Sequence, residues 1–378
     1  MRQNRDTRVL RECTELPEAE RIWERLNEER APEDVYGTLP GFGAWARCDP
    51  DAHPLPLWVA YRDGAPVALL PVKRRWQLVK GVKLGVLDAA GNDHWKVGNP
   101  LVGRDPEGSI EALLDGLRRR GQWDILDLGP MLQDSEMLEL LVRQGRRLGL
   151  KPQIRWAQDD PVVKLTGPWE AYYGSLSSNL RTKVRQGEAK LSQVGPLRLE
   201  EHLGGPDLES TLEEFYRVEA SGWKGRAGTA IASKDHDLLF YTRLAYEAAR
   251  RGWLRVYVLR AGQQCVAADY CLAYDHILYM LRVGYDERWA ACSPGQVMRK
   301  RVLEHLFASG RDEIYDMMPG GGDHRAYKMR WANAVRRRVS VRLYHPRSVR
   351  GQIAAGAFRL REWLRGRLGE APTANRAA

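Results

Sequence analysis

A glycine-rich segment, residues 315–331, combines three side-chain types that transfer protons or stabilise charge. It reads Tyr-Asp-Met-Met-Pro-Gly-Gly-Gly-Asp-His-Arg-Ala-Tyr-Lys-Met-Arg-Trp and begins in a predicted strand. The glycines predict a flexible loop that brings together the carboxylate of Asp323, the phenol of Tyr327 and the amine of Lys328. Because α/β proteins place substrates at loops that follow strands, we expect this loop to be functional.

Two other segments of the second half carry residues that could bind a ligand. Residues 219–225 read Glu-Ala-Ser-Gly-Trp-Lys-Gly and follow a predicted helix, so they are either a helix C-cap with a packing aromatic or part of a site. The run Ser293-Pro294-Gly295-Gln296 precedes another predicted helix. Free N–H groups at that helix start could hold a phosphate, although proline is ordinary at this position.

A predicted helical segment between these elements and the first half is basic. It spans residues 169–194 and contains Arg181, Lys183, Arg185 and Lys190. Charged runs are usually solvated helix faces, and that interpretation stays open. The functional alternative is a cradle for an anionic substrate.

The elements that would position these residues follow a plan that recurs in each half of the chain. In the first half, apolar runs at 57–61 and 67–72 flank an Arg-Asp-Gly turn and predict a hairpin, followed by a helix at 109–120 and a strand at 124–128. In the second half, strands are predicted at 254–259, 265–274 and 277–283, then a helix at 294–309 and a strand at 313–317. Two mixed α/β units are predicted, with a seam where polar residues and a proline interrupt the pattern at 158–161.

Composition and motifs exclude several classes of protein. The chain has 378 residues and is 43% hydrophobic, which suits two packed domains rather than a disordered or fibrous protein. It contains no nucleotide-binding, dinucleotide-binding, serine-hydrolase or zinc-protease motif, and its scattered histidines and five cysteines indicate neither a metal site nor a disulfide framework. A buried role is expected for Cys265 and Cys271. No run is long enough to span a membrane and no signal sequence is evident, so a cytoplasmic protein is expected.

The positive charge is concentrated near the C-terminus. Ten arginines and one acid, Glu362, lie between Arg336 and Arg367, which leaves almost no net charge for the rest of the chain. A helix over this region would have Arg361 and Arg365 beside the side opposite to an apolar face, which is made of Val349, Ile353, Ala357, Leu360, Leu364 and Leu368. That face either docks on the protein's own core or, with Trp363, lies on an anionic membrane surface.

The Glu-x-x-Gly-Trp-Lys-Gly segment, the strand-rich middle, the Ser-Pro-Gly before a helix and the glycine-rich strand end with Tyr-Lys together resemble a known family. They are similar to GNAT-type acyltransferases of the CelD/BioF2-like group, which is associated with cellulose and exopolysaccharide synthesis and related to the Fem aminoacyltransferases. The resemblance implies two tandem GNAT-like domains with mixed, mostly antiparallel sheets, at 1–160 and 161–345. The second domain would be catalytic, and residues 346–378 would form the basic amphipathic helix and tail.

The resemblance also implies the donor and where it binds. GNAT proteins hold the pyrophosphate of acyl-CoA at a helix start, here Ala291 to Val297, with Ser293, Gly295, Gln296 and Val297 as the binding residues. Only Gly295 fits the family's loop pattern, so an aminoacyl-tRNA donor stays an alternative. Acyl-CoA is favoured and nucleic acid disfavoured, because the second half has no basic stripe beyond residues 181–190.

The transfer implied by the family is a direct attack of an amine or hydroxyl on a thioester, without a metal. Asp316 and Asp323, with Asp269 behind them, would handle the proton, and Lys328 and Tyr327 would stabilise the oxyanion or hold the acceptor. Each of these side chains could instead form a structural ion pair. The remaining residues expected to line the acceptor cleft are Arg282, Trp223 and Lys224.

The acceptor follows from the same resemblance and from the tail. A sugar, a lipid-linked sugar or a long-chain base is expected, the last two with peripheral attachment of residues 347–368 at the inner membrane face. A non-catalytic scaffold of a polysaccharide-synthesis complex, with the fold kept and the CoA loop lost, is the rival from a different class.

Overall fold

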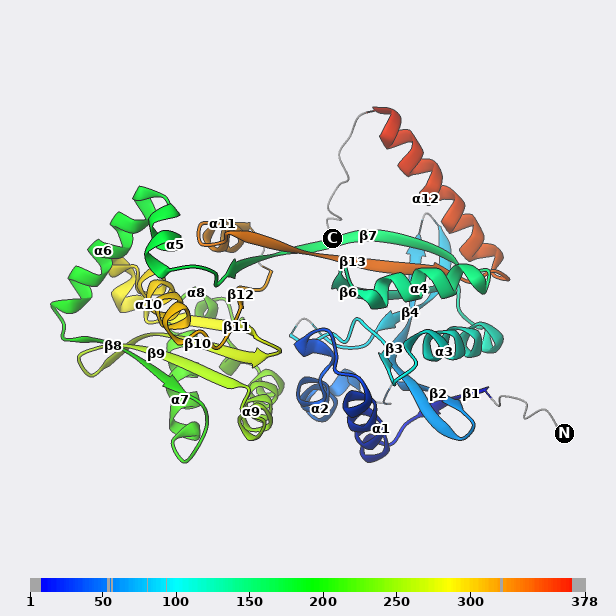
Figure 1. Cartoon of the computed structure of the whole chain (residues 1–378), viewed down its shortest axis with the longest axis horizontal. Helices are drawn as coiled ribbons and strands as arrows, with labels where there is room; N and C mark the ends of the chain where they lie inside the picture. The colour runs from blue at the N-terminus through cyan, green and yellow to red at the C-terminus, as the bar shows by residue number, and fades with distance from the viewer. Residues whose placement is uncertain are drawn as a thin grey trace. The chain divides into compact units, whose positions relative to one another are not determined.

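The computed structural model describes residues 8–52, 55, 57–79, 81–92, 94–319 and 322–368, without the side chains of 51, 223, 322–324 and 361–368. The chain divides into two compact units (Figure 1). Unit 1 comprises residues 1–158 and 337–378, and unit 2 comprises residues 159–336. The sequence predicts a second domain ending at 345 and a separate tail, whereas this division places residues 337–378 with the first unit.

Unit 1 is a mixed sheet with helices on both faces. Its strands pair in the order β1 (Arg8–Cys13), β2 (Leu57–Arg62), β3 (Ala65–Val79), β4 (Val82–Ala89), β6 (Ile125–Leu132) and β13 (Ala334–Tyr344), and the short β5 (Leu101–Val102) pairs with β3. All of these pairs are antiparallel except β4 with β6. The helices are α1 (Leu16–Glu29), α2 (Leu39–Cys48), α3 (Pro106–Arg120), α4 (Glu136–Arg147) and α12 (Val349–Leu368).

Local sequence signals explain the main turns and caps of unit 1. Asp63 and Gly64 both have positive φ, +51° and +81°, which is the conformation of a two-residue hairpin turn, and the predicted hairpin is confirmed. Asp105 caps α3 by accepting the Gly108 N–H, and Ser135 caps α4 by accepting the Leu138 N–H. The apolar faces of α3 and α4 pack on one side of the sheet.

Unit 2 also has mixed strand pairings. Its strands pair in the order β7 (Lys151–Lys164), β12 (Ile314–Asp316), β11 (Ile277–Tyr285), β10 (Gln264–Tyr274), β9 (Leu254–Ala261) and β8 (Leu197–His202). Only β11 and β12 are parallel. The helices are α5 (Trp169–Ser175), α6 (Ser178–Ser192), α7 (Leu208–Ala220), α8 (Trp223–Arg226), α9 (Asp235–Arg250), α10 (Pro294–Ser309) and α11 (Gly322–Met329). Short 3₁₀ turns of the two units span Val35–Gly37, Pro50–Ala52, Ile231–Ser233 and Glu287–Cys292.

Helices cover both faces of the sheet in unit 2. In Figure 1, α5, α6 and α10 lie on one side, and α7 and α9 on the other. The apolar residues of α6 and α10 share one core with the facing side chains of β9, β10 and β11, and Phe215 of α7 packs against Tyr270 on the opposite face. The mixed α/β fold with mostly antiparallel strands is confirmed.

The pairing of β11 leaves one stretch of backbone open. β11 pairs with β12 only where Ile277–Tyr279 face Ile314–Asp316, and it continues to Tyr285 along β10. In the described part of the chain, residues 280–285 therefore have a strand neighbour on one edge only. That open edge lies where the candidate site is built.

Three local predictions differ from the structure. The seam predicted at 158–161 coincides with the division between the units after Gln158, but the strand is not interrupted there, because β7 runs through Pro161, whose carbonyl accepts the Met317 N–H. The loop predicted to carry Tyr327 and Lys328 is in fact the helix α11. The single helical segment predicted at 169–194 is two helices, separated at Leu176 and Ser177.

Candidate functional site

A cavity of about 150 Å³ lies in unit 2 where α7, β11, α10 and α11 meet. Four of the residues singled out in the sequence line it, namely Lys224, Asp269, Gly295 and Tyr327. The other lining residues are Glu219, Gly222, Val283, Gly284, Tyr285 and Arg299. The cavity therefore combines two carboxylates, two phenols, two cations and open strand backbone.

Asp269 and Arg299 form a buried ion pair in this cavity. Arg299 Nη1 lies 2.9 Å from Asp269 Oδ2, and the two residues are 1% and 2% exposed. Asp269 points from β10 toward α10 because strand residues alternate between faces, and it shares its face with the buried Cys271. Burial raises the pKa of Asp269, and the charge of Arg299 opposes that shift. A carboxylate in this setting can accept a proton from a nucleophile near neutral pH.

Tyr327 brings a hydroxyl to the start of α10. Its hydroxyl donates to the carbonyl oxygen of Gly295 at 2.9 Å, and burial raises its pKa, so it remains a neutral donor at pH 7. A Cβ built on Gly295 would lie 3.8 Å from this hydroxyl and 3.9 Å from the Tyr285 ring, which are ordinary contacts, so Gly295 is not required here by crowding.

The start of α10 has amide groups without side-chain caps. Ser293 adopts a left-handed conformation with φ of 51° and makes no side-chain cap. Gln296 and Val297 donate their amides to the Ser293 carbonyl, and among the described residues no hydrogen bond to the Gly295 N–H is seen. A helix start in this state can bind an anion.

Gln296 and Val297 contribute to packing rather than to this surface. The Gln296 side chain accepts from the indole of Trp331 at 2.8 Å, and Val297 lies in the core. Of the four residues predicted to bind the donor, Ser293 and Gly295 line cavities, whereas these two side chains point into the unit.

Glu219 and Lys224 join α7 to β11. Lys224 Nζ donates to Glu219 Oε1 at 2.9 Å and to the Val283 carbonyl at 2.7 Å. Glu219 Oε2 accepts the Ile231 N–H at 3.0 Å. A Cβ on Gly284 would lie 2.5 Å from the Cα of Glu219, so only glycine lets α7 approach the strand this closely. Sequence reasoning quoted Glu219 as the start of a motif but did not assign it to the site.

The remaining predicted site residues lie beside the cavity or outside the described side chains. Asp316 is fully buried, accepts the Met318 N–H at 2.8 Å and pairs with Arg336 at 3.1 Å. Lys328 donates to the carbonyls of Met318 and Pro319, and burial lowers its pKa to about 8.

Arg282 lies on the α9 side, where its Nε donates to the Tyr241 hydroxyl at 2.6 Å. Trp223 begins α8 and Asp323 lies in α11, but the side chains of both are outside the described part of the structure.

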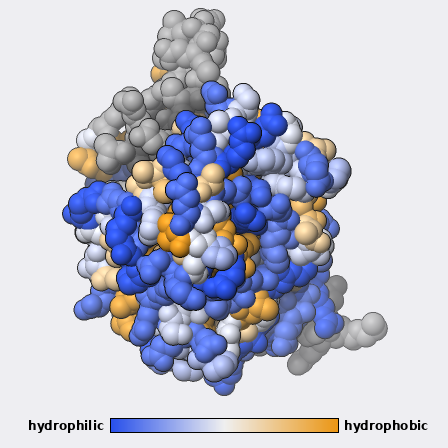
Figure 2. Space-filling model, turned by 90° about the vertical axis from the view of Figure 1, so that its left-hand side faces the viewer, coloured by the Kyte–Doolittle hydropathy of each residue, from blue (hydrophilic) through white to orange (hydrophobic). Residues whose placement is uncertain are grey.

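A second cavity, of about 360 Å³, lies on the other side of Ser293. It is lined by polar and basic residues of α6 and by the turn before α10, namely Asn179, Thr182, Lys183, Gln186, Gly187, Lys190, Ala291, Cys292 and Ser293. Gly187 makes this contact possible, since a Cβ there would lie 2.4 Å from the Cys292 carbonyl oxygen. We call this surface the α6 groove. Figure 2 shows the side of the molecule that carries α6, where hydrophilic residues predominate and hydrophobic patches are small.

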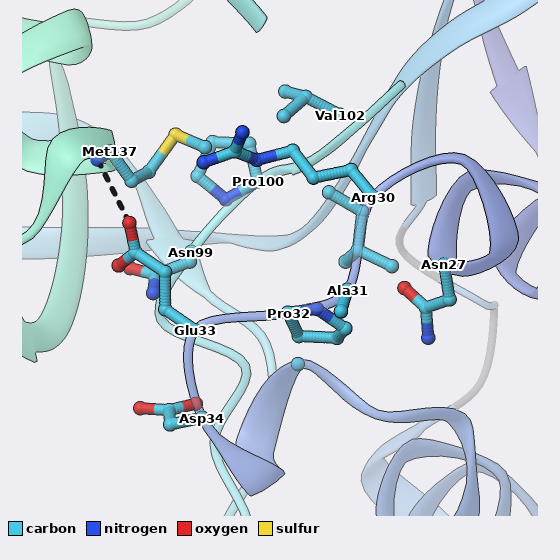
Figure 3. Close-up of a pocket in the computed structure, with 12 residues that line it drawn as sticks. Asn27, Arg30, Ala31, Pro32, Glu33, Asp34, Asn99, Pro100, Val102 and Met137 are labelled. Atoms are coloured by element: carbon cyan, nitrogen blue, oxygen red, sulfur yellow. Dashed lines mark hydrogen bonds between the residues drawn. The ribbon is translucent and has the colours of Figure 1, made fainter. Parts of the chain in front are cut away.

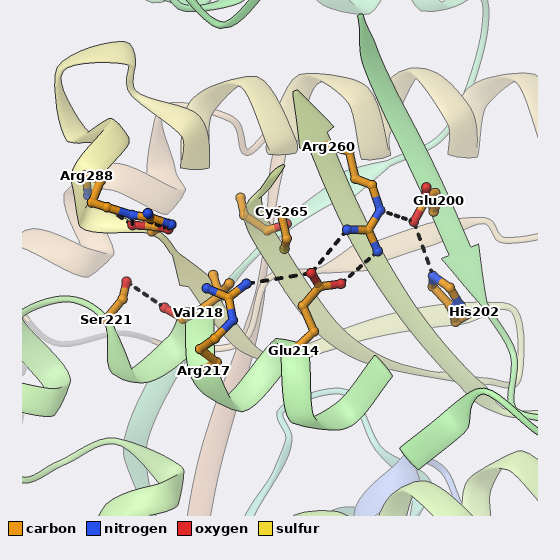
Figure 4. A network of polar contacts seen from close by, with 11 residues as sticks. Glu200, His202, Glu214, Arg217, Val218, Ser221, Arg260, Cys265 and Arg288 are labelled. Carbon is orange, nitrogen blue, oxygen red and sulfur yellow. Dashed lines mark hydrogen bonds and ion pairs between the residues drawn. The ribbon is translucent and has the colours of Figure 1, made fainter. Parts of the chain in front are cut away.

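A polar network on the opposite face of the sheet is structural. Arg260 of β9 binds Glu200 of β8 at 2.6 Å and Glu214 of α7 at 2.7 Å, and Arg217 lies 3.6 Å from Glu214 (Figure 4). Cys265 lies beside this network, and burial raises its pKa to about 12. A thiol with so high a pKa is a poor nucleophile at neutral pH.

Unit 1 contains one small pocket among those described, between the end of α1 and the start of α4 (Figure 3). Glu33 accepts the Met137 N–H at 3.2 Å, burial raises its pKa, and its other oxygen has no hydrogen-bond partner among the residues that the structure describes. The cavity volume is about 30 Å³, which is room for one or two water molecules rather than a substrate.

Comparisons with known proteins identify a domain and similar folds. Residues 178–329 match the model of the acetyltransferase (GNAT) domain. The structure is similar to that of FemX, with 10% identity, a TM-score of 0.54, and coverage of 89% of this chain and 97% of that chain. It is also similar to L-PGS from Bacillus licheniformis, with 13% identity, a TM-score of 0.50, and coverage of 93% and 98%. No curated protein sequence matches.

The chain thus contains a GNAT acetyltransferase domain, and the cavity lies within it. The matched domain supports a transferase, and the similarity to the two solved structures extends to the fold of most of the chain. Among the described residues, no cluster of three or more acidic, histidine or cysteine side chains could hold a metal ion. No described helix is both long enough and apolar enough to cross a bilayer.

Proposed function

We propose that the chain transfers an acyl group from acyl-CoA to an amine or hydroxyl acceptor by direct attack in the 150 Å³ cavity. The observation that carries the proposal is the placement of a buried carboxylate, Asp269, opposite a neutral hydroxyl donor, Tyr327, at the start of α10. Both line the cavity together with Val283 of β11, in the segment that matches the GNAT domain.

The residues around the cavity suit the two chemical parts of the donor. The α6 groove offers Lys183, Lys190 and the Ser293 hydroxyl to phosphates, next to the unbonded Gly295 N–H. The open edge of β11 offers backbone groups to the amides of an extended pantetheine arm, as a sheet edge does to a peptide.

Each catalytic task then falls to a described group. Asp269 accepts the proton of the attacking amine or hydroxyl, and Arg299 keeps Asp269 ionised enough to do so. Tyr327 donates a proton to the departing sulfur, so that free thiol leaves. In a strand, the N–H and C=O of one residue point to the same edge. The Val283 carbonyl faces Lys224 rather than β10, so the Val283 N–H also points away from β10 and into the site. This N–H can stabilise the oxyanion.

The roles predicted for Asp316 and Lys328 are supporting ones in this proposal. Asp316 fixes the strand end that precedes α11, and Lys328 holds the carbonyls of Met318 and Pro319, which together set the position of Tyr327. Arg282 would position α9 through Tyr241.

The acceptor that we propose is a sugar, a lipid-linked sugar or a long-chain base, in line with the resemblance to transferases of exopolysaccharide synthesis. Aminoacyl-tRNA is the alternative donor. The exposed basic residues of α6 that lie outside the groove would favour it, because a nucleic acid needs several phosphate contacts. A non-catalytic scaffold would use none of these groups for chemistry.

The test is a calorimetric titration of the whole chain with acetyl-CoA, a long-chain acyl-CoA and free CoA, followed by an assay of thiol release with amine and hydroxyl acceptors. Asp269→Asn should bind the donor and release at least about 100-fold less thiol per unit time, whereas Glu209→Gln, an exposed acid on α7, should match wild type. No binding of any thioester would refute the donor assignment. Binding of aminoacyl-tRNA in its place would select the second donor, and binding of neither would favour the scaffold.

A further inference from the structure

The C-terminal helix α12 of unit 1 presents apolar residues to the outside. Val349, Ile353 and Leu360 are 73%, 58% and 57% exposed. At about 100° per residue, these three positions fall within roughly 40° of one another on the helix. We call this stripe the outer face of α12.

The opposite side of α12 is the side that packs on unit 1. Ala355 is buried against Leu84, Val86, Ile125 and Tyr344. A Cβ on Gly351 would lie 2.7 Å from the Asp124 carbonyl oxygen, so the helix approaches the sheet through its small residues. Gln352 donates to the His345 carbonyl at 2.8 Å, which further fixes the rotation of the helix. The outer face is therefore exposed because the helix is held by its other side.

Basic residues flank the outer face. Arg350 and Arg359 lie on its two sides, at about 100° and 280° from Val349, and the half-exposed Arg350 side chain also lies 3.5 Å from Asp124. Of the ten arginines between Arg336 and Arg367, the β13 residues Arg336, Arg338 and Arg342 pair with Asp316, Asp34 and Asp127, so the flanking charge comes from α12 itself. An apolar stripe between cationic flanks is typical of a helix that lies in the interface of an anionic bilayer.

We propose that the outer face of α12 docks on an anionic lipid membrane, with the helix axis in the membrane plane. Phospholipid headgroups would neutralise the arginines, and the acyl boundary would cover Val349, Ile353 and Leu360. A second copy of the chain is a poorer occupant, because two such helices would bring like charges together. This proposal does not depend on the acyl-transfer proposal, since α12 belongs to unit 1 and the cavity to unit 2.

The experiment is co-flotation of the whole chain with vesicles of phosphatidylcholine alone or of phosphatidylcholine mixed with phosphatidylglycerol. We expect binding to the mixed vesicles, at least about 10-fold weaker binding to phosphatidylcholine alone, and weakening of the first by salt. The triple variant Val349→Ser, Ile353→Ser, Leu360→Ser should lose binding by a similar factor with an unchanged melting temperature, because the three side chains are exposed. Leu239→Ser, which alters a 52% exposed leucine of α9, is the matched control and should bind like wild type.

Two experimental results would overturn the proposal. One is equal binding by wild type and the triple variant, or no binding to mixed vesicles at all. The other is a wild-type dimer in analytical ultracentrifugation that the triple variant loses, which would assign the outer face to a second copy. Arg350→Gln with Arg359→Gln should weaken only the binding to anionic vesicles, and an unchanged affinity there would remove the electrostatic part of the argument.

Discussion

The Asp269–Arg299 pair allows its structural role to be separated from its chemical role. Both residues are almost completely buried, and their side chains lie 2.9 Å apart. Asp269→Asn leaves an uncompensated guanidinium in the interior, which costs about 3–5 kcal/mol of unfolding free energy, a large part of the roughly 5–15 kcal/mol of a typical domain. Arg299→Met leaves the opposite charge and should cost a similar amount. The double variant removes both charges, so its loss should be smaller than the sum of the single losses by about 2–3 kcal/mol.

Activity should not follow stability in this series. Asp269→Asn should lower kcat by about 10²–10⁴-fold because the proton acceptor is lost. The double variant should regain much of the stability and none of the activity. In Arg299→Met, the pKa of Asp269 should rise further because the opposing charge is gone, so the pH–rate profile should move to higher pH.

Chemical denaturation followed by circular dichroism gives the free energies, and thiol release gives kcat over a range of pH. Recovery of activity in the double variant would refute the assignment of Asp269 as the base, because its carboxylate would be dispensable. A wild-type kcat in folded Asp269→Asn would do the same. Additive losses of stability would show instead that the two charges do not compensate each other.

Three further predictions concern the surroundings of the cavity. Tyr327→Phe should lower kcat by about 10²-fold and leave the KM for the acyl donor nearly unchanged, which steady-state kinetics can show; a changed KM alone would assign Tyr327 to binding. Gly284→Ala should cost about 1–3 kcal/mol of unfolding free energy because its Cβ would meet α7, whereas Gly174→Ala, with nothing within 4 Å, should cost nothing, as denaturation would test. Burial lowers the pKa of Lys328 from 10.5 to about 8, so between these pH values only the unfolded chain holds the proton. The free energy of unfolding should therefore rise with pH over this range, by about 3 kcal/mol in total. Lys328→Met should remove that rise, and equal slopes for both proteins would contradict it.

The elements with regular patterns could be predicted from the sequence. The hairpin at Asp63-Gly64 follows from its turn residues, and α10 follows from a proline at its start and apolar spacing along its length. Asp269 could be placed on the same strand face as Cys271 because the strand period is two. Gly295 could be placed at the helix start because it follows Pro294, a residue typical of the first helical position.

The contacts that complete the cavity could not be predicted in this way. Arg299 is a charged residue in a buried turn of α10, and only the tertiary position of Asp269 explains it. Glu219 and Lys224 meet because Gly284 lets α7 approach β11, a distance that no local pattern encodes. The glycines before α11 predicted a loop, but the helix forms after them, where Tyr327 packs on α10. The strand β7 continues through Pro161 because this residue takes part in the pairing as an acceptor. Its carbonyl accepts the Met317 N–H, and no amide of its own is needed.

The distribution of charge around the cavity bears on the choice of donor. Inside it, Glu219 pairs with Lys224 and Asp269 with Arg299, so the two acids and two bases compensate each other. Such a site attracts an anion only weakly from a distance, and its polar groups act at short range, in proton transfer. The uncompensated positive charge lies instead on the α6 groove, at Lys183 and Lys190. Selection between CoA and tRNA should therefore depend on α6, and Lys183→Gln with Lys190→Gln should weaken donor binding without shifting the pH–rate profile that Asp269 sets.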